Sequence, residues 1–220
     1  MAGRKGGAGS GPQGRHNRQE EVLEAAIEVF HEKGYASASI QDVADSVGVL
    51  KGSLYHYIDS KEDLLANVFD GSDEQSFLIM GEKADLELPA IERLHAFVRD
   101  WALWHLANVE RASVYLKEWK HLEGERLARV KERRRTYERF VIGLIDEAKA
   151  DGAADAALDS RYACYFVLSA INGLPSWYRR RGPDPAARIA DIYADMIVAM
   201  VRNSPGRPRP AAAKPGRRGR

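Results

Sequence analysis

Apolar residues recur at helical spacing along almost the whole of the range 17–202. In the first such segment Leu23, Ala26, Ile27 and Phe30 follow the i, i+3, i+4, i+7 spacing that places them on one face of a helix. No stretch shows the sustained apolar–polar alternation that is typical of strands, and no internal repeat is visible. The pattern therefore predicts an all-α fold.

Capping signatures divide the first third of the chain into short helices. A capping residue followed three positions later by an acidic residue predicts helix starts at Asn17, Ser39 and Ser60. The first helix is expected to end at Lys33 and Gly34, a cation followed by a residue that tolerates left-handed backbone geometry. Three short helices in succession predict a compact N-terminal unit.

Longer apolar patterns follow this unit. Breaks near Pro89, at Gly124, in the segment DGAADAAL and at Gly182 separate helices expected at 61–82, 90–107, 110–122, 125–150, 159–180 and 186–202. The chain is therefore expected to have a disordered arm at 1–17, a small helical domain at 18–63, a larger helical body at 64–202 and a disordered tail at 203–220.

The N-terminal unit has the residues that a helix-turn-helix requires. Two helices packed at a steep angle need a small residue at their crossing, which is Ala44, and a glycine at the turn, which is Gly48. Apolar residues must hold the second helix down, and these occur at Val43, Val47, Val49 and Leu54. The agreement of so many positions predicts a DNA-binding helix pair.

The stretch GYASASIQDVADSVGVLKGSLYHYIDSKEDLL resembles the DNA-binding domain of the TetR family of transcriptional regulators. The resemblance covers residues 18–65 without a gap and includes the pair Gly34-Tyr35, the core Gly-Ser-Leu-Tyr and the Ser-Lys-Glu-Asp-Leu that opens the next helix. It implies that the third helix enters the major groove of operator DNA and that the start of the fourth meets phosphate. Most members of this family are repressors that a small ligand releases from DNA.

The resemblance also implies the residues that meet DNA. Lys51 and His56 are expected at base edges, and Ser53 and Tyr55 at phosphates, while Gly52 allows close approach of the backbones. Further phosphate contacts are expected from Ser39, Gln41 and Lys61. An aromatic knot in which Tyr55, His56 and Tyr57 only pack is the alternative, and packing is the expected role of Tyr57.

Charge is strongly segregated behind a formal net value of +1. Residues 1–19 contain four basic and no acidic residues, and residues 201–220 contain seven basic and no acidic residues, so residues 20–200 carry about −10. Both ends are rich in Gly, Pro and Ala, which is typical of disorder. The C-terminal PGRPRP also resembles the centre of an AT-hook, a minor-groove binder, although a solvated tail is the simpler interpretation.

The helix-turn-helix unit is itself acidic. Residues 20–63 contain ten acidic residues but only three lysines, whereas DNA affinity depends largely on neutralised phosphates. We therefore hypothesise that the basic arm at 1–17 lies along the DNA next to the recognition helix, as homeodomain arms do.

A chain that begins at Asn17 should bind its operator more weakly and with a shallower salt dependence, because fewer phosphates are neutralised. Fluorescence anisotropy across a salt series measures both quantities. An unchanged affinity and slope would exclude a role for the arm.

The last two expected helices, 159–180 and 186–202, carry more apolar surface than packing against a single core would bury. Residues expected at a homodimer interface are Tyr162, Phe166, Ser169, Gly173, Ile192 and Met196, with a purely internal core as the alternative. The family resemblance agrees, since this body usually dimerises and binds the effector. A two-fold symmetric dimer predicts a near-palindromic operator.

Aromatic residues gather in the middle helices, as is typical both of cores and of cavities for apolar ligands. Expected ligand-binding residues are Trp101, Trp104, His105, Tyr115, Trp119, Arg134 and Trp177. The segment SWYRRRGPD, residues 176–184, resembles family members that respond to CoA thioesters, with arginines such as those of KERRRTYERF suited to phosphate. An apolar metabolite or drug-like effector without CoA is the alternative.

Other functional classes have less support. No phosphate loop, nucleophile elbow or paired carboxylates indicate an enzyme, and the spacing of His95, His105 and His121 does not predict a metal site, so no cofactor is expected. A tail-driven architectural DNA-binding protein remains a further alternative. The sequence shows no secretory signal and no apolar run of about 18 residues, and Cys164 has no second cysteine with which to form a disulfide. The chain is therefore expected in the cytoplasm.

Overall fold

The computed structural model describes residues 12–203, with side chains from Arg18 onward, and every regular element in this range is helical. The elements are α1 (Pro12–Lys33), α2 (Ile40–Val47), α3 (Lys51–Leu54), α4 (Lys61–Ala84), α5 (Ala90–Ala107), α6 (Val109–Glu118), the short 3-10 helix η1 (Trp119–His121), α7 (Gly124–Ala150), α8 (Ser160–Trp177) and α9 (Ala186–Arg202). The expected all-α fold is confirmed.

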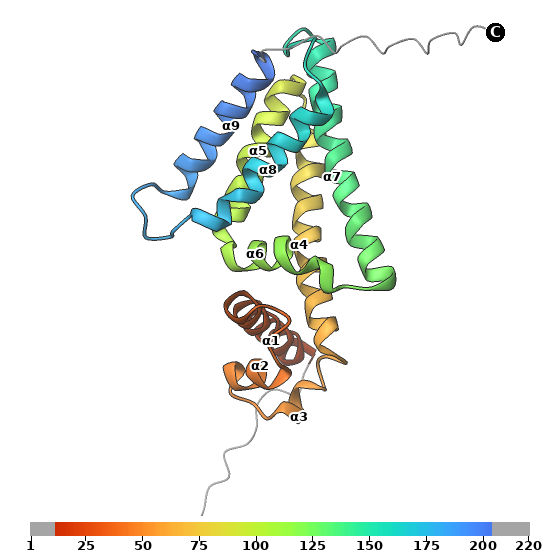
Figure 1. Ribbon diagram of the computed structural model, residues 1–220, viewed down its shortest axis with the longest axis vertical. Coiled ribbons are helices and arrows are strands. Elements are labelled where there is room, and N and C mark those ends of the chain that lie inside the picture. Colours follow the sequence, from red (N-terminus) through yellow and green to blue (C-terminus); the bar gives the residue numbers. More distant parts are fainter. Residues whose placement is uncertain (1–11, 204–220) are drawn as a thin grey trace, which may run out of the picture.

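The helices form two units joined by α4. Figure 1 shows α1–α3 gathered at one end of the molecule, α5 and α7–α9 packed together at the other, and α6 crossing between them. α4 runs without a break from the small unit into the large one, across the domain boundary expected after residue 63. Within residues 12–203, no helix combines the length and the apolar character that a membrane crossing requires.

The capping predictions for α2 and α4 are confirmed. The Ser39 hydroxyl accepts the Asp42 N–H while the Asp42 carboxylate accepts the Ser39 N–H, a reciprocal capping box. Ser60 caps α4 in the same way by accepting the Asp63 N–H at 3.1 Å. α1, however, begins at Pro12 and not at Asn17, so the last part of the expected arm is helical; residues 1–11 and the tail from residue 204, with its PGRPRP segment, lie outside the described residues.

The turn between α2 and α3 forms as its sequence predicts. Gly48 has a φ of 71°, in the left-handed region that glycine adopts without strain, and its N–H bonds back to the end of α2. Ala44 is fully buried at the crossing, and Val43 and Leu54 are fully buried beside it. Close packing around a small residue therefore fixes the angle between the two helices.

The recognition helix α3 is shorter than expected. It ends at Leu54, and Tyr55, His56 and Tyr57 form a turn after it. The His56 N–H donates to the Ser53 carbonyl and the Tyr57 N–H to the Leu54 carbonyl, three residues back in each case, which tightens the backbone beyond an α-helix. Tyr57 packs against the core, so its expected packing role is confirmed.

Two hydrophobic cores meet along α4. The first half of α4, including Leu65 and Phe69, joins the core of α1–α3, which also takes in Val114, Leu122 and Val130 from the base of the body. The other core lies among α5, α7, α8 and α9. Between the two, α4 buries a polar segment made of Ser72, Asp73 and Ser76.

Asp73 is the centre of this polar segment. Its side chain is 1% exposed, and its Oδ1 accepts the hydroxyl protons of Tyr115 at 2.8 Å and Tyr137 at 2.9 Å. Arg133 of α7 ion-pairs with its other oxygen and also with the exposed Asp70 at 2.9 Å. A buried carboxylate is tolerated only with such partners, so this network ties α4 to α6 and α7.

Replacing Asp73 by Asn should lower the free energy of unfolding by about 3 kcal/mol, because the charge of Arg133 loses its buried partner. Urea denaturation measures the change. Asp70→Asn is the matched control: Asp70 contacts the same arginine but is 49% exposed on its side chain, so its loss should cost less than about 1 kcal/mol. Equal effects of the two changes would show that burial at Asp73 is not what matters.

Candidate DNA-binding surface and ligand cavity

The residues expected to meet DNA gather on one surface of the small unit. Lys51, Gly52, Tyr55 and His56 are exposed, whereas Leu54 between them is fully buried. A Cβ atom added at Gly52 would meet no protein atom within 4 Å, so the space in front of this residue is open. The backbone here can approach a nucleic acid closely.

The three lysines of this unit are not equally available. Lys33 ion-pairs with Asp42 at 2.6 Å, and the Lys61 ammonium lies 4.2 Å from the centroid of the Tyr35 ring. Burial lowers the pKa of Lys61. Among the described residues, no ion pair engages Lys51. The recognition surface thus presents Lys51 as its most available cation, and phosphate contact by Lys61 stays a prediction.

The other expected contacts, Ser39 and Gln41, are exposed near the start of α2 but already bonded locally. Ser39 is the helix cap, and the Gln41 amide donates to Asp45 at 2.7 Å. The N-terminal N–H groups of α2 are the remaining donors at this place. Whether these residues meet phosphate stays a prediction.

Several carboxylates of the acidic unit face the helical body instead of the recognition surface. Glu24, Glu28 and Glu32 of α1 line a polar cleft shared with α6. Arg111 of α6 ion-pairs with Glu24 at 2.5 Å, and Arg126 of α7 with Asp63 at the start of α4. Part of the negative charge of the unit is therefore neutralised at the contact between the two units.

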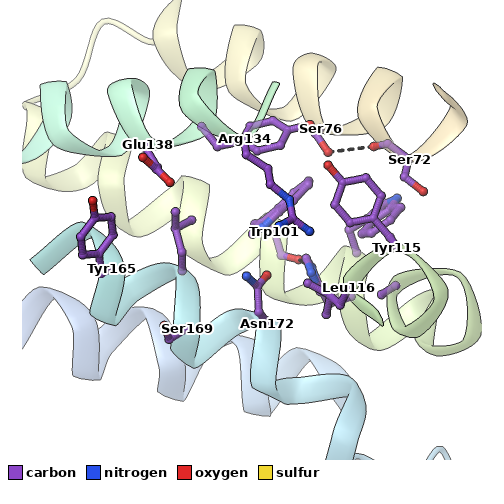
Figure 2. Close-up of a pocket in the computed structure, with 15 residues that line it drawn as sticks. Ser72, Ser76, Trp101, Tyr115, Leu116, Arg134, Glu138, Tyr165, Ser169 and Asn172 are labelled. Carbon is purple, nitrogen blue, oxygen red and sulfur yellow. Dashed lines mark hydrogen bonds between the residues drawn. The ribbon is translucent and has the colours of Figure 1, made fainter. Parts of the chain in front are cut away.

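A cavity of about 410 Å³ lies in the body, a size typical of small-molecule sites. Its lining comes from α4–α8 and consists of Ser72, Ser76, Trp101, Trp104, His105, Ala112, Tyr115, Leu116, Arg134, Tyr137, Glu138, Tyr165, Leu168, Ser169 and Asn172. Figure 2 shows Ser72, Ser76 and Tyr115 at one end and Glu138 with Tyr165 at the other. Tyr165 and Ser169 are exposed whereas Ser72 and Ser76 are buried, so the cavity opens along α8.

Arg134 provides a cation for a ligand in this cavity. Its guanidinium lies 4.6 Å from the Trp119 ring centroid and 6.0 Å from that of Tyr115, held by the ring faces. Across residues 18–203, no carboxylate ion-pairs with it. The neighbouring arginines are engaged elsewhere: Arg133 with Asp73, and Arg135 with Glu132.

His105 is a buried neutral side chain of the cavity wall. Its Nδ1 lies 2.9 Å from the Trp101 carbonyl, which can only accept, so Nδ1 carries the proton. Its ring packs edge-on against Trp101 and Trp104. Burial lowers the pKa of His105 to about 4, with the bonds to Trp101 and Asn172 acting in the opposite direction.

Five of the seven residues expected at the ligand site line the cavity, and two do not. Trp119 lies in η1 and packs on the N-terminal core, behind Arg134. Trp177 lies at the end of α8, where its ring stacks on Tyr193 of α9. Trp177 is 48% exposed on the outer surface. The sequence did not indicate Ser72, Ser76 and Tyr137, because their meeting depends on how α4 packs against α7.

The arginines of the segment at 176–184 do not reach the cavity. Arg180 ion-pairs with Glu110 of α6 at 2.6 Å, and Arg179 donates to the carbonyl of its neighbour Tyr178. The segment also leaves the helix earlier than expected, since Tyr178 already has an extended backbone. Within residues 18–203, no arginine of this segment lines the cavity, and Arg134 is the one arginine among its lining residues.

The outer faces of α8 and α9 carry exposed apolar side chains. Phe166 is 58% exposed and Met196 is 65% exposed, and Tyr162 and Ile192 are exposed as well. Gly173 continues the stripe on α8. Ser169, expected at the dimer interface, is exposed and also lines the cavity. Such a patch on a water-exposed surface is typical of a protein–protein interface.

Comparison with known proteins agrees with this geometry. Residues 22–68 match the family model described as "Bacterial regulatory proteins, tetR family", and residues 87–201 match that of the "Tetracyclin repressor-like, C-terminal domain". The chain belongs to the TetR family of transcriptional regulators. The resemblance seen in the sequence of the helix-turn-helix is confirmed, and the family is one of regulators, not of enzymes.

Similar TetR-family proteins cover most of the chain. The transcriptional repressor KstR2 of Rhodococcus jostii is 27% identical over 186 residues, which are 84% of this chain and 91% of that protein. The structure of KstR2, the ketosteroid transcriptional regulator of Mycobacterium tuberculosis, gives a TM-score of 0.81 at 23% identity over 84% of this chain and 95% of that one. The structure of AibR with isovaleryl coenzyme A and operator DNA gives a TM-score of 0.74 at 24% identity, over 81% of this chain and 97% of that one.

The low pKa of His105 predicts how stability depends on pH. An unfolded histidine binds a proton near pH 6.5 and the folded one only near pH 4, so the contribution to stability is complete above pH 6.5 and is lost as the pH falls toward 4. Between pH 7 and 5, wild type should lose about 2 kcal/mol more than His105→Phe. Urea denaturation at both pH values measures the difference, and equal losses would contradict it.

Proposed function

We propose that this TetR-family regulator is a repressor that binds a near-palindromic operator as a homodimer and is released by an acyl-CoA thioester. The observation that carries the proposal is the combination of an exposed α3 surface with a ligand-sized cavity, joined by one continuous helix, α4. A ligand in the cavity touches the helix whose first half belongs to the core of the DNA-binding unit.

The DNA-binding part rests on the exposed residues around α3. Lys51 can donate to guanine O6 and N7 in the major groove, and the Tyr55 hydroxyl and the backbone at Gly52 can lie against phosphates. We assign DNA binding to residues 18–63 and ligand binding and dimerisation to residues 64–202, with α4 shared by both units.

The dimer part rests on the α8–α9 face. Tyr162, Phe166 and Gly173 lie along α8, and Ile192 and Met196 along α9, with large apolar side chains in water. Burying such side chains is favourable by roughly 1.5–3 kcal/mol each. A two-fold arrangement would place two α3 surfaces on two half-sites about one DNA turn apart.

The effector part rests on the chemistry of the cavity. Trp101 and Trp104, stacked with their centroids 5.4 Å apart, offer an apolar wall, and Arg134 offers a cation that no carboxylate of the described chain engages. The cavity suits an acyl chain, with the bulk of a CoA group beyond its opening along α8. The AibR structure with isovaleryl coenzyme A gives this ligand class a precedent among proteins of similar fold. An apolar effector without CoA would use the same wall.

Lys51→Ala and Phe166→Asp separate the two surfaces. Lys51→Ala should stay dimeric but bind operator roughly 5- to 150-fold more weakly, because a base contact is worth about 1–3 kcal/mol. Phe166→Asp should sediment as a monomer and lose operator binding, because its charge enters an apolar interface. Sedimentation velocity and anisotropy with a duplex selected from random-sequence DNA measure both.

Leu78→Asp is the control for adding a charge to an exposed apolar position. Leu78 is 54% exposed on α4, outside the proposed α8–α9 interface, and its replacement should change neither quantity. A dimer that persists in Phe166→Asp would exclude the α8–α9 interface, and unchanged operator binding by Lys51→Ala would exclude the α3 surface.

A further inference from the structure

One end of the cavity is a wall of hydroxyl groups. Ser72 and Ser76 of α4, Tyr115 of α6 and Tyr137 of α7 all line it, and we call these four residues the hydroxyl wall. Ser72 and Ser76 are each 2% exposed, which places the wall at the closed end, opposite the exposed Tyr165. Figure 2 shows the Tyr115 ring reaching from α6 toward the two serines. A ligand that fills the cavity meets these oxygens.

Each of the four hydroxyl protons is already bound to a protein acceptor. Ser72 donates to the Val68 carbonyl at 2.8 Å, and Ser76 donates to the Ser72 carbonyl at 2.7 Å. Tyr115 and Tyr137 both donate to Oδ1 of Asp73. A hydroxyl has one proton and two lone pairs, so in this arrangement the wall presents lone pairs to a ligand.

The tyrosine protons cannot be redirected to a ligand at low cost. Their bonds run to a buried carboxylate and are charge-assisted, hence about twice as strong as neutral ones. Turning one away would leave a lone pair of Asp73 without a donor, at a cost of roughly 1–3 kcal/mol. Burial, together with the negative charge of Asp73, raises the pKa of both tyrosines, which keeps them protonated.

The group that best matches this wall is therefore a hydrogen-bond donor. Arg134 lines the same cavity, and Arg133 lies directly behind the wall on Asp73. Asp73 balances the charge of Arg133, and an ammonium group would have to lose its water at the closed end of the cavity, so a neutral donor such as a hydroxyl is favoured. A carbonyl, carboxylate or ether oxygen of a ligand would set its lone pairs against those of the tyrosine oxygens, which have the Asp73 carboxylate behind them.

We propose that the effector carries a hydroxyl group on its apolar part and places it against the hydroxyl wall. This inference builds on the cavity site proposed above and adds a specificity to it: a hydroxylated chain or ring system binds in preference to the plain or oxidised one. Arg134 then remains for an acceptor group of the same molecule, such as the carbonyl next to the chain.

Matched ligands test this specificity on the full-length protein. Isothermal titration compares decanoyl-CoA, 9-hydroxydecanoyl-CoA and 9-oxodecanoyl-CoA, and then the same three chains as free acids. The hydroxy compound should bind about 10-fold more tightly than the oxo compound, because it gains one hydrogen bond that the oxo group cannot form. The plain chain should lie between them.

The two series separate this inference from the CoA proposal. Equal affinity for the hydroxy and oxo chains, or a preference for the oxo chain, would overturn the hydroxyl inference. If the CoA series still bound, the proposed ligand class would stand. Hydroxy preference among the free acids alone would uphold the inference and overturn CoA. Binding by none of the six would overturn both.

A variant locates the preference in the wall. In Asp73→Asn the amide can donate to one tyrosine oxygen, which frees that tyrosine proton to point into the cavity. The hydroxy preference should then fall at least threefold, whereas Asp70→Asn should keep it. An undiminished preference in folded Asp73→Asn would overturn the assignment to the wall; if that variant does not fold, Tyr137→Phe replaces it, with the same expected fall.

Discussion

One buried carboxylate, Asp73, constrains how the helices of the body meet. A charge with 1% exposure can exist there only if donors surround it, and α6 supplies Tyr115 while α7 supplies Tyr137 and Arg133. These donors arrive from different helices, so α4, α6 and α7 must converge at this residue. The convergence separates the two hydrophobic cores and sets the closed end of the cavity between them. Fold and ligand site thus depend on the same contact.

The acidity of the DNA-binding unit has a structural explanation in the contact between units. Glu24 and Asp63 pair with Arg111 and Arg126 of the body, so their charges serve cohesion and do not face a nucleic acid. Lys51, in contrast, is exposed on the α3 surface. A unit with a net negative count can therefore present a locally suitable face to DNA, since nearby charges dominate over distant ones that salt screens.

Local signals in the sequence were sufficient for most of the fold. The caps at Ser39 and Ser60 and the turn at Gly48 involve residues within a few positions of each other, and the structure confirms them. The site was harder. Aromatic density in the middle helices indicated four lining residues, and the arginine-rich segment indicated a fifth, Arg134. Trp177 points outward because helix rotation is set by packing that composition does not encode. Ser72, Asp73 and Ser76 resembled ordinary polar positions, and the tyrosine partners of Asp73 lie 42 and 64 residues away along the chain.

The position of the cavity matters for regulation because a ligand shifts an equilibrium only through contacts that differ between two states. A pocket confined to one rigid core would bind its ligand equally well in every arrangement of the DNA-binding unit. Here the wall residues Ser72 and Ser76 lie on α4, whereas Tyr115 and Tyr137 lie on α6 and α7. Any displacement of α4 relative to those helices would change the wall itself, so a ligand held there would favour one placement of α4, and such a coupling would be reciprocal.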